Sequence, residues 1–90
     1  MSSRRVIFED AFGVAAERFG GYIVIDEVLD PIVDALYRNP FAFKIIENNW
    51  FRCRYAITKP LGNIPALCVF FKIDDDGHVF LCDLEQFEEY

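Results

Sequence analysis

Two arginines lie two residues apart in the stretch WFRCRYAI, which covers residues 50–57. Arg52 and Arg54 share one parity of this stretch, and Cys53 and Tyr55 share the other. Alternate residues of a β-strand point to opposite faces of the sheet, so both guanidinium groups should lie on one face. Guanidinium groups bind phosphates and carboxylates and stack on aromatic rings at protein interfaces. The stretch therefore predicts a partner-binding or phosphate-binding surface.

A less specific interpretation applies to the same pair. Arginines on an exposed strand face often pair with carboxylates across the sheet, here Glu47 or Asp83, for a modest gain in stability.

Other motifs are weaker. The turn DDDG, residues 74–77, lacks the alternating carboxylates of a calcium loop, and His78 is the only histidine. The cysteines, which are odd in number and form no C-x-x-C pair, indicate neither zinc nor disulfides. We expect no metal and no cofactor.

The charge distribution limits the class of partner. The chain carries a net charge of −6, which argues against general binding to nucleic acid. Residues 38–59 are locally basic, with five cationic side chains and one carboxylate, whereas residues 74–90 hold seven carboxylates and no Lys or Arg. This asymmetry predicts two surfaces of opposite charge.

The pattern along the chain predicts a single α+β domain over residues 1–90. Residues 4–9 should form a strand. A helix capped by Asp10 should follow and end at Gly20-Gly21. A second helix, residues 23–38, contains Pro31, so it either begins there or is kinked there. After Asn39-Pro40, which stops that helix, the predicted strands are residues 42–47, 51–59, 66–74 and 78–84. The fold class is thus an N-terminal strand, a two-helix hairpin and a three- to four-stranded antiparallel meander with the helices on one face.

Strand parity predicts which side chains face the helices. With an even loop at residues 74–77, one face of the last hairpin should be the core face: Leu67, Val69, Phe71, Ile73, Phe80, Cys82 and Leu84. If the apolar parity of the preceding strand also faces the core (Phe51, Cys53, Tyr55 and Ile57), the opposite parity faces outward. Arg52 and Arg54 would then join Phe70 and Lys72 on an open sheet face where a partner could dock.

The second half of the sequence resembles the RelE/ParE toxin superfamily of bacterial type II toxin–antitoxin systems. The resemblance lies in the helical pair ending in LYRNP and in FRCRYAITKPLGNIPALCVFFKIDDDGHVFLCDLEQFEEY, and it extends over roughly residues 6–90. Members share the order of strand, helical hairpin and antiparallel meander. One of their meander strands often reads R-x-R-Y, and a D-D-G turn leads into the last strand.

This resemblance implies a small cytoplasmic toxin that binds a cellular target and is neutralised by a cognate antitoxin. RelE-type members are ribosome-dependent endoribonucleases that cut messenger RNA with basic residues and a tyrosine near the C-terminus. Arg52, Arg54, Lys72 and Tyr90 are the corresponding candidates for catalysis. ParE-type members instead inhibit DNA gyrase. Carboxylates over residues 83–90, where nucleases of the family carry Lys or Arg, would repel the scissile phosphate and argue against RNA cleavage.

The predicted partner-binding residues are Arg52, Arg54, Phe70 and Lys72. The expected partners are the antitoxin and either the ribosome with its message or DNA gyrase, with no membrane partner. A further alternative is a non-toxic, degenerate interaction module that forms a homodimer through a sheet edge or through a Phe-rich surface. The docking surface and the family resemblance both depend on one geometric condition, which is that Arg52 and Arg54 point away from the helices.

Overall fold

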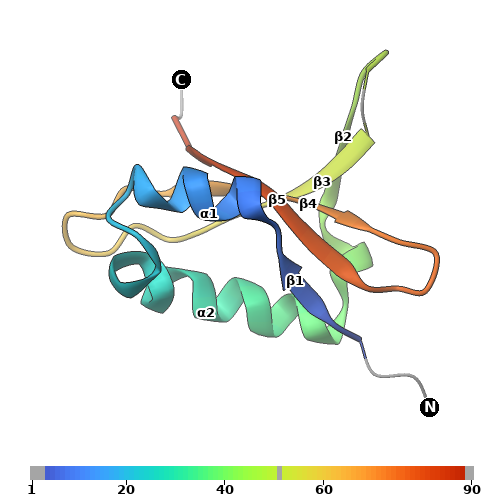
Figure 1. The fold of residues 1–90 in the computed structure, drawn as a ribbon, viewed down its shortest axis with the longest axis horizontal. Helices are drawn as coiled ribbons and strands as arrows, with labels where there is room; N and C mark the ends of the chain where they lie inside the picture. The colour runs from blue at the N-terminus through green and yellow to red at the C-terminus, as the bar shows by residue number, and fades with distance from the viewer. Residues whose placement is uncertain (1–3, 51, 89–90) are drawn as a thin grey trace.

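The computed structural model describes residues 4–50 and 52–88. The chain forms the elements in the predicted order (Figure 1). They are β1 (Val6–Phe8), α1 (Asp10–Glu17), α2 (Tyr22–Arg38), the 3₁₀ turn η1 (Pro40–Ala42), β2 (Lys44–Glu47), β3 (Arg52–Ile57), β4 (Leu67–Ile73) and β5 (Val79–Gln86). None of the described helices is long and apolar enough to span a membrane.

The strands form one mixed sheet in the order β1-β5-β4-β3-β2. Strands β2 to β5 form the predicted antiparallel meander, and β1 pairs with β5 in parallel. The helical hairpin thus connects β1 to a meander whose last strand returns beside it. The predicted α+β fold is confirmed, with the addition that β1 joins the same sheet.

Both helices bury one face against the sheet. Phe12, Ala15 and Ala16 of α1 pack with Ile25, Leu29 and Leu36 of α2 over a single face of β3, β4 and β5, whose buried residues are Ala56, Leu67, Val69, Phe71, Val79, Leu81 and Leu84. Among residues 4–50 and 52–88, no helix packs on the opposite face of the sheet. We call this helix-free side the open face.

The helix boundaries agree closely with the sequence signals. Glu9, rather than Asp10, occupies the N-cap position of α1, and its side chain makes no capping hydrogen bond. Gly20 and Gly21 separate the helices with φ angles of 102° and 83°, which L-residues rarely adopt. Helix α2 continues through Pro31, so the alternative in which it begins at that proline is wrong.

The predicted core parity of β5 is wrong for its first half. The loop between β4 and β5 has an odd number of residues, because Ile73 pairs with Val79 rather than with His78 or Phe80. Val79 and Leu81 are therefore buried under the helices, and Phe80 and Cys82 lie on the open face. A bulge beside Phe70 and Phe71 then shifts the register and returns Leu84 to the core, as predicted.

The predicted parity of β3 is also wrong. Arg54 pairs with Phe71 and Ala56 with Val69, and residues paired across a ladder share a face. Arg54 therefore lies on the helix side of the sheet, and Cys53, Tyr55 and Ile57 lie on the open face. Phe51, which was expected in the core, is outside the described residues. Alternation alone could not choose between the two faces because both parities of this strand include residues that a core accepts.

We predict that Gly20→Ala destabilises the protein more than Gly62→Ala. At Gly20 the φ angle is 102° and an added Cβ would lie 2.8 Å from Val24 Cγ2, whereas at Gly62 the φ angle is 59° and no atom lies within 4 Å. We expect losses of about 2–3 kcal/mol and about 1 kcal/mol, respectively, in the free energy of unfolding. Urea denaturation measures both. Equal losses would contradict the close contact between the interhelical turn and Val24.

Candidate functional site

Three of the four cationic and aromatic residues proposed for catalysis line a single pocket. Arg52, Arg54 and Lys72 surround a volume of about 350 Å³, and the remaining lining residues are Phe41, Ile45, Cys53 and Ile73. We call this the cationic pocket. Tyr90, the fourth candidate, is outside the described residues, so its position relative to the pocket stays a prediction.

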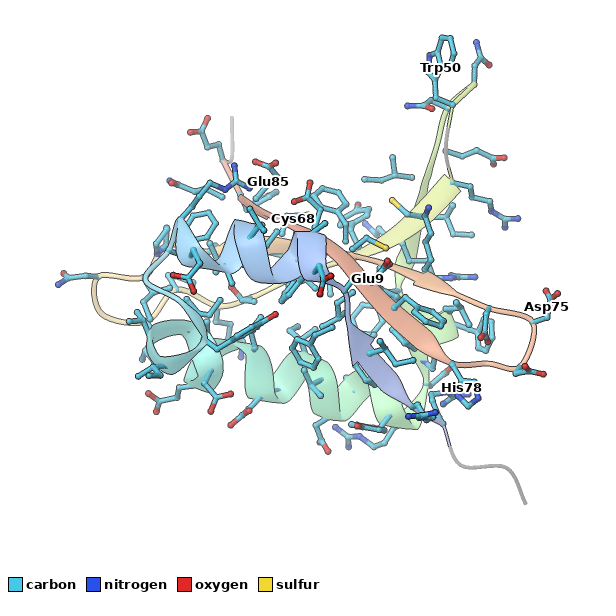
Figure 2. The ribbon with its side chains drawn as sticks, viewed as in Figure 1. Glu9, Trp50, Cys68, Asp75, His78 and Glu85 are labelled. Carbon is cyan, nitrogen blue, oxygen red and sulfur yellow. The ribbon has the colours of Figure 1, made fainter. Side chains whose placement is uncertain are left out.

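The pocket exists because β3 diverges from β4. The ladder between them ends at the pair of Arg54 with Phe71, although β3 begins at Arg52 and β4 continues to Ile73. Beyond that pair the β2–β3 hairpin extends away from the helices (Figure 1), and it carries Trp50, which is 90% exposed, near its tip (Figure 2). Side chains from both faces of the sheet therefore reach the space between the separated strands.

Arg54 is held against the segment that follows α2. Its Nη1 donates to the carbonyl oxygens of Phe41 at 3.2 Å and of Phe43 at 2.7 Å. The guanidinium carbon lies 5.5 Å from the centre of the Phe41 ring, within the range of a cation–π contact. Arg54 thus fixes η1 to β3 and brings its positive charge to the edge of the pocket.

Within residues 4–50 and 52–88, neither Arg52 nor Lys72 forms an ion pair. The ion pairs within residues 4–50 and 52–88 involve Arg18 and Arg38 but none of the three pocket cations. Glu47 pairs with Arg52 in the β2–β3 ladder without forming an ion pair, and Asp83 lies 3.9 Å from Arg18. Glu47 thus lies opposite Arg52 across the sheet, as the less specific interpretation expects, but without an ion pair, and Asp83 pairs with Arg18 rather than with Arg52 or Arg54.

A second, more apolar pocket of about 470 Å³ adjoins the first on the open face. Its lining combines Ile46 of β2, Cys53 of β3 and Phe70 of β4 with residues of β5, and it shares Cys53 and Lys72 with the cationic pocket. Its border on β5 is formed by Cys82, Asp83 and Glu85; Glu85 is labelled in Figure 2. We call this the open-face groove.

The four residues predicted to bind a partner are therefore distributed over two adjoining surfaces. Phe70 lies in the open-face groove, Arg52 and Arg54 lie in the cationic pocket, and Lys72 borders both. The docking surface in which both arginines and Lys72 share the open face does not exist, because Arg54 lies on the helix side and Arg52, two residues earlier in β3, has the same parity. Strand divergence nevertheless brings all three cations together.

The three cysteines lie on the open face, and the pKa of each thiol is raised, which favours the protonated form. Burial is the main cause that raises the pKa of Cys53, that of Cys68 to about 11 and that of Cys82 to about 12. The single thiol proton of Cys82 is shared between Glu9 Oε1 and the carbonyl oxygen of Phe80, each 3.2 Å from Sγ. The hydrogen bond to the Glu9 carboxylate adds to the rise in the Cys82 pKa, because it stabilises the protonated thiol.

The described lining can bind an anion but offers little acid–base chemistry. Apart from the arginines and Lys72, the cationic pocket contains only apolar side chains and Cys53. His78 lies at the far turn (Figure 2), where its Nδ1 accepts from the Arg5 amide at 3.1 Å. Asp74 closes the same turn by accepting from the amides of Asp76 and His78. Among the described residues no cluster of His, Cys, Asp and Glu could hold a metal ion.

Sequence reasoning missed several residues of the site. Phe41 and Ile45 belong to the pocket because the chain turns back at η1, where the Asn39 side chain accepts from the Phe41 amide. The Asn-Pro stop signal marked this turn but could not show that it packs against Arg54. Asp83 lies within the predicted last strand, at the parity opposite the predicted core face, whereas Glu85 lies beyond the predicted end of that strand. Strand β5 continues to Gln86 with a bulge, and both carboxylates border the groove.

We predict that Arg54→Gln destabilises the fold and that Arg52→Gln does not. Arg54 donates from Nη1 to two backbone carbonyls, and losing charged hydrogen bonds costs about 1–3 kcal/mol. Arg52 is exposed and makes no ion pair in the described chain, so its change should stay within about 0.5 kcal/mol. Thermal and urea unfolding compare the two variants. Equal stability would show that Arg54 does not anchor η1.

We predict slow alkylation of Cys82 by iodoacetamide at pH 8, because a pKa of about 12 leaves almost no thiolate. Glu9→Gln removes the carboxylate that favours the protonated thiol, so this change should lower the pKa and speed labelling. Mass spectrometry of the labelled peptides gives the rate, and the urea-unfolded protein is the reference for an unprotected thiol. Equal rates in the folded and unfolded chains would contradict the assigned environment.

Comparison with protein-family models, with curated proteins and with solved structures found no match to this chain.

Proposed function

We propose that this protein is the binding component of a two-protein module of the toxin–antitoxin type. In this proposal it acts by binding a cellular target, the ribosome or DNA gyrase, and a small antitoxin neutralises it by covering the open-face groove and the cationic pocket. The observation that carries the proposal is the junction of these two surfaces at Cys53 and Lys72.

The open-face groove supports partner binding because much of its lining is apolar and none of the described helices covers it. Phe70 is partly exposed, and Tyr55 lies beside it in the β3–β4 ladder. Aromatic side chains on such a surface are typical anchors of protein interfaces. The groove has a volume of about 470 Å³.

The order of elements also supports the proposal. A strand, a helical hairpin and an antiparallel meander follow one another, which is the order that the resemblance to the RelE/ParE superfamily implies. The condition on which that resemblance depends, that Arg52 and Arg54 both point away from the helices, is not met, because Arg54 faces the helix side. The R-x-R-Y strand therefore gives the resemblance no support, and only the element order remains of it. The proposal therefore rests on the element order and on the two adjoining surfaces.

Ribosome-dependent RNA cleavage is the second candidate, because Arg52, Arg54 and Lys72 line one pocket. General acid–base catalysis needs a group that exchanges a proton near neutral pH. The described lining supplies only Cys53 besides the cations, and burial raises the pKa of that thiol. Asp83 and Glu85 add negative charge near Lys72. Binding without cleavage is therefore the function that the geometry supports better.

We predict that inducing the gene alone arrests growth and leaves messenger RNA intact, whereas co-expression with an adjoining short reading frame restores growth and yields a stable complex. Phe70→Arg should abolish the complex, because it places a charge in the apolar groove. Ile23→Arg is the matched control, since Ile23 is 97% exposed on α2. Pull-down with circular dichroism on both variants measures binding and folding.

Three outcomes would contradict this account. Failure to form any complex with the neighbour would remove the two-protein module. Loss of binding in Ile23→Arg but not in Phe70→Arg would place the partner on the helices. Cleaved messages after induction, relieved by Lys72→Gln, would favour the nuclease.

A further inference from the structure

We infer that the partner segment occupying the two joined pockets is a polypeptide with a bipolar charge pattern. It presents a carboxylate to the cationic pocket, apolar side chains to the open-face groove and a basic side chain to the acidic border on β5. This inference rests on the proposed function, because it names the chemistry of the segment that covers the same surface.

The two ends of the combined surface carry opposite charge. At one end Arg52 and Lys72 have no ion-pair partner in the described chain, and the chain supplies no carboxylate to the described lining of the cationic pocket. Arginine binds carboxylates with paired donors, so an acidic side chain fits this end. The lining between the ends, Ile46, Cys53 and Phe70, favours apolar side chains.

At the other end Asp83 and Glu85 share a single cation. Arg18 Nη2 lies 3.9 Å from Asp83 Oδ1 and 3.7 Å from Glu85 Oε1, and all three side chains are about half exposed. Arg18 also donates to the carbonyl oxygen of Leu84 at 2.9 Å. Two carboxylates with one long-range guanidinium leave local negative charge, which a Lys or Arg of the partner would neutralise.

The sheet geometry fixes the spacing between the two charges of the partner. Asp83 lies in one row with Phe70 and Tyr55, two strand spacings or about 10 Å across the sheet, and Arg52 lies three residues further along β3, about 10 Å along the strand. The two charges are therefore about 14 Å apart. A helical segment covers this distance with roughly nine residues, and an extended segment covers it with about four. The spacing found between the acidic and the basic residue therefore reports the conformation of the bound segment.

A polypeptide fits this surface better than a nucleic acid does. A strand of RNA repeats negative charge along its length, so a phosphate close to Lys72 would place neighbouring phosphates near Asp83 and Glu85. The net charge of −6 adds a general repulsion. Only a chain that changes sign along its length satisfies both ends at once.

The test is selection of a random 16-residue peptide display library on the immobilised full chain, followed by fluorescence anisotropy with synthetic copies of the selected peptides. We expect selected peptides to carry an acidic and a basic residue separated by apolar residues. Arg52→Glu should weaken binding about tenfold. Exchanging the peptide's acidic residue for Lys should restore the affinity of that variant, which a merely structural role of Arg52 would not produce.

A matched reversal, the double variant Asp83→Lys and Glu85→Lys, should be rescued by exchanging the basic residue of the peptide for Glu. Selection of no peptides, of peptides without the two charges, or of peptides that neither reversal affects would overturn the inference. Tighter binding of a single-stranded RNA 12-mer, weakened by Lys72→Gln, would overturn it in favour of a nucleic acid. If the neighbouring gene product binds but the charge pattern is absent, the inference fails and the proposed function stands. If the selected peptides carry the charge pattern but the neighbouring gene product does not bind, the proposed function fails and the inference about the charge pattern stands.

Discussion

The register of β3 against β4 is the constraint on which the rest of the structure depends. Ala56 lies opposite Val69 in the core, and this pairing commits every other residue of β3 to one face. Cys53 and Tyr55 are placed on the open face, and Arg54 is placed on the helix side. A shift of one residue would bury Tyr55 under the helices and separate Arg54 from the carbonyls of Phe41 and Phe43. The open face and the cationic pocket are thus consequences of the same pairing.

Two irregularities of the sheet turn this register into a binding surface. The divergence of β3 from β4 beyond Arg54 opens the cationic pocket. The bulge in β5 adds one residue between the Phe71–Leu81 and Phe70–Asp83 pairs, which keeps Leu84 in the core while Asp83 and Glu85 border the groove. A perfectly regular meander would lack the pocket and would turn different residues of β5 outward. Bulges and strand ends are common sites of function for this reason.

The sequence predicted the elements and their order well because the local signals are strong. Gly20-Gly21 and Asn39-Pro40 separate and end the helices as expected, and DDDG makes the turn before β5. The faces of β3 and β5 were predicted wrongly because parity depends on loop length, and one extra residue between Ile73 and Val79 reverses it. The grouping of Arg52, Arg54 and Lys72 was expected on an open face, yet it arises from strand divergence, which no local pattern encodes. The roles of Phe41, Asp83 and Glu85 required the tertiary structure.

The central claim is that a protein partner covers the face of the sheet that the helices leave free. Hydroxyl-radical footprinting of aromatic side chains, read by mass spectrometry in the free chain and in the complex with the neighbouring gene product, tests it most directly. Tyr55 and Phe70 of the open face should be protected in the complex, and Tyr22 and Tyr37 of the helix layer should react equally in both states. Protection of Tyr22 and Tyr37, with Tyr55 and Phe70 unchanged, would contradict the claim.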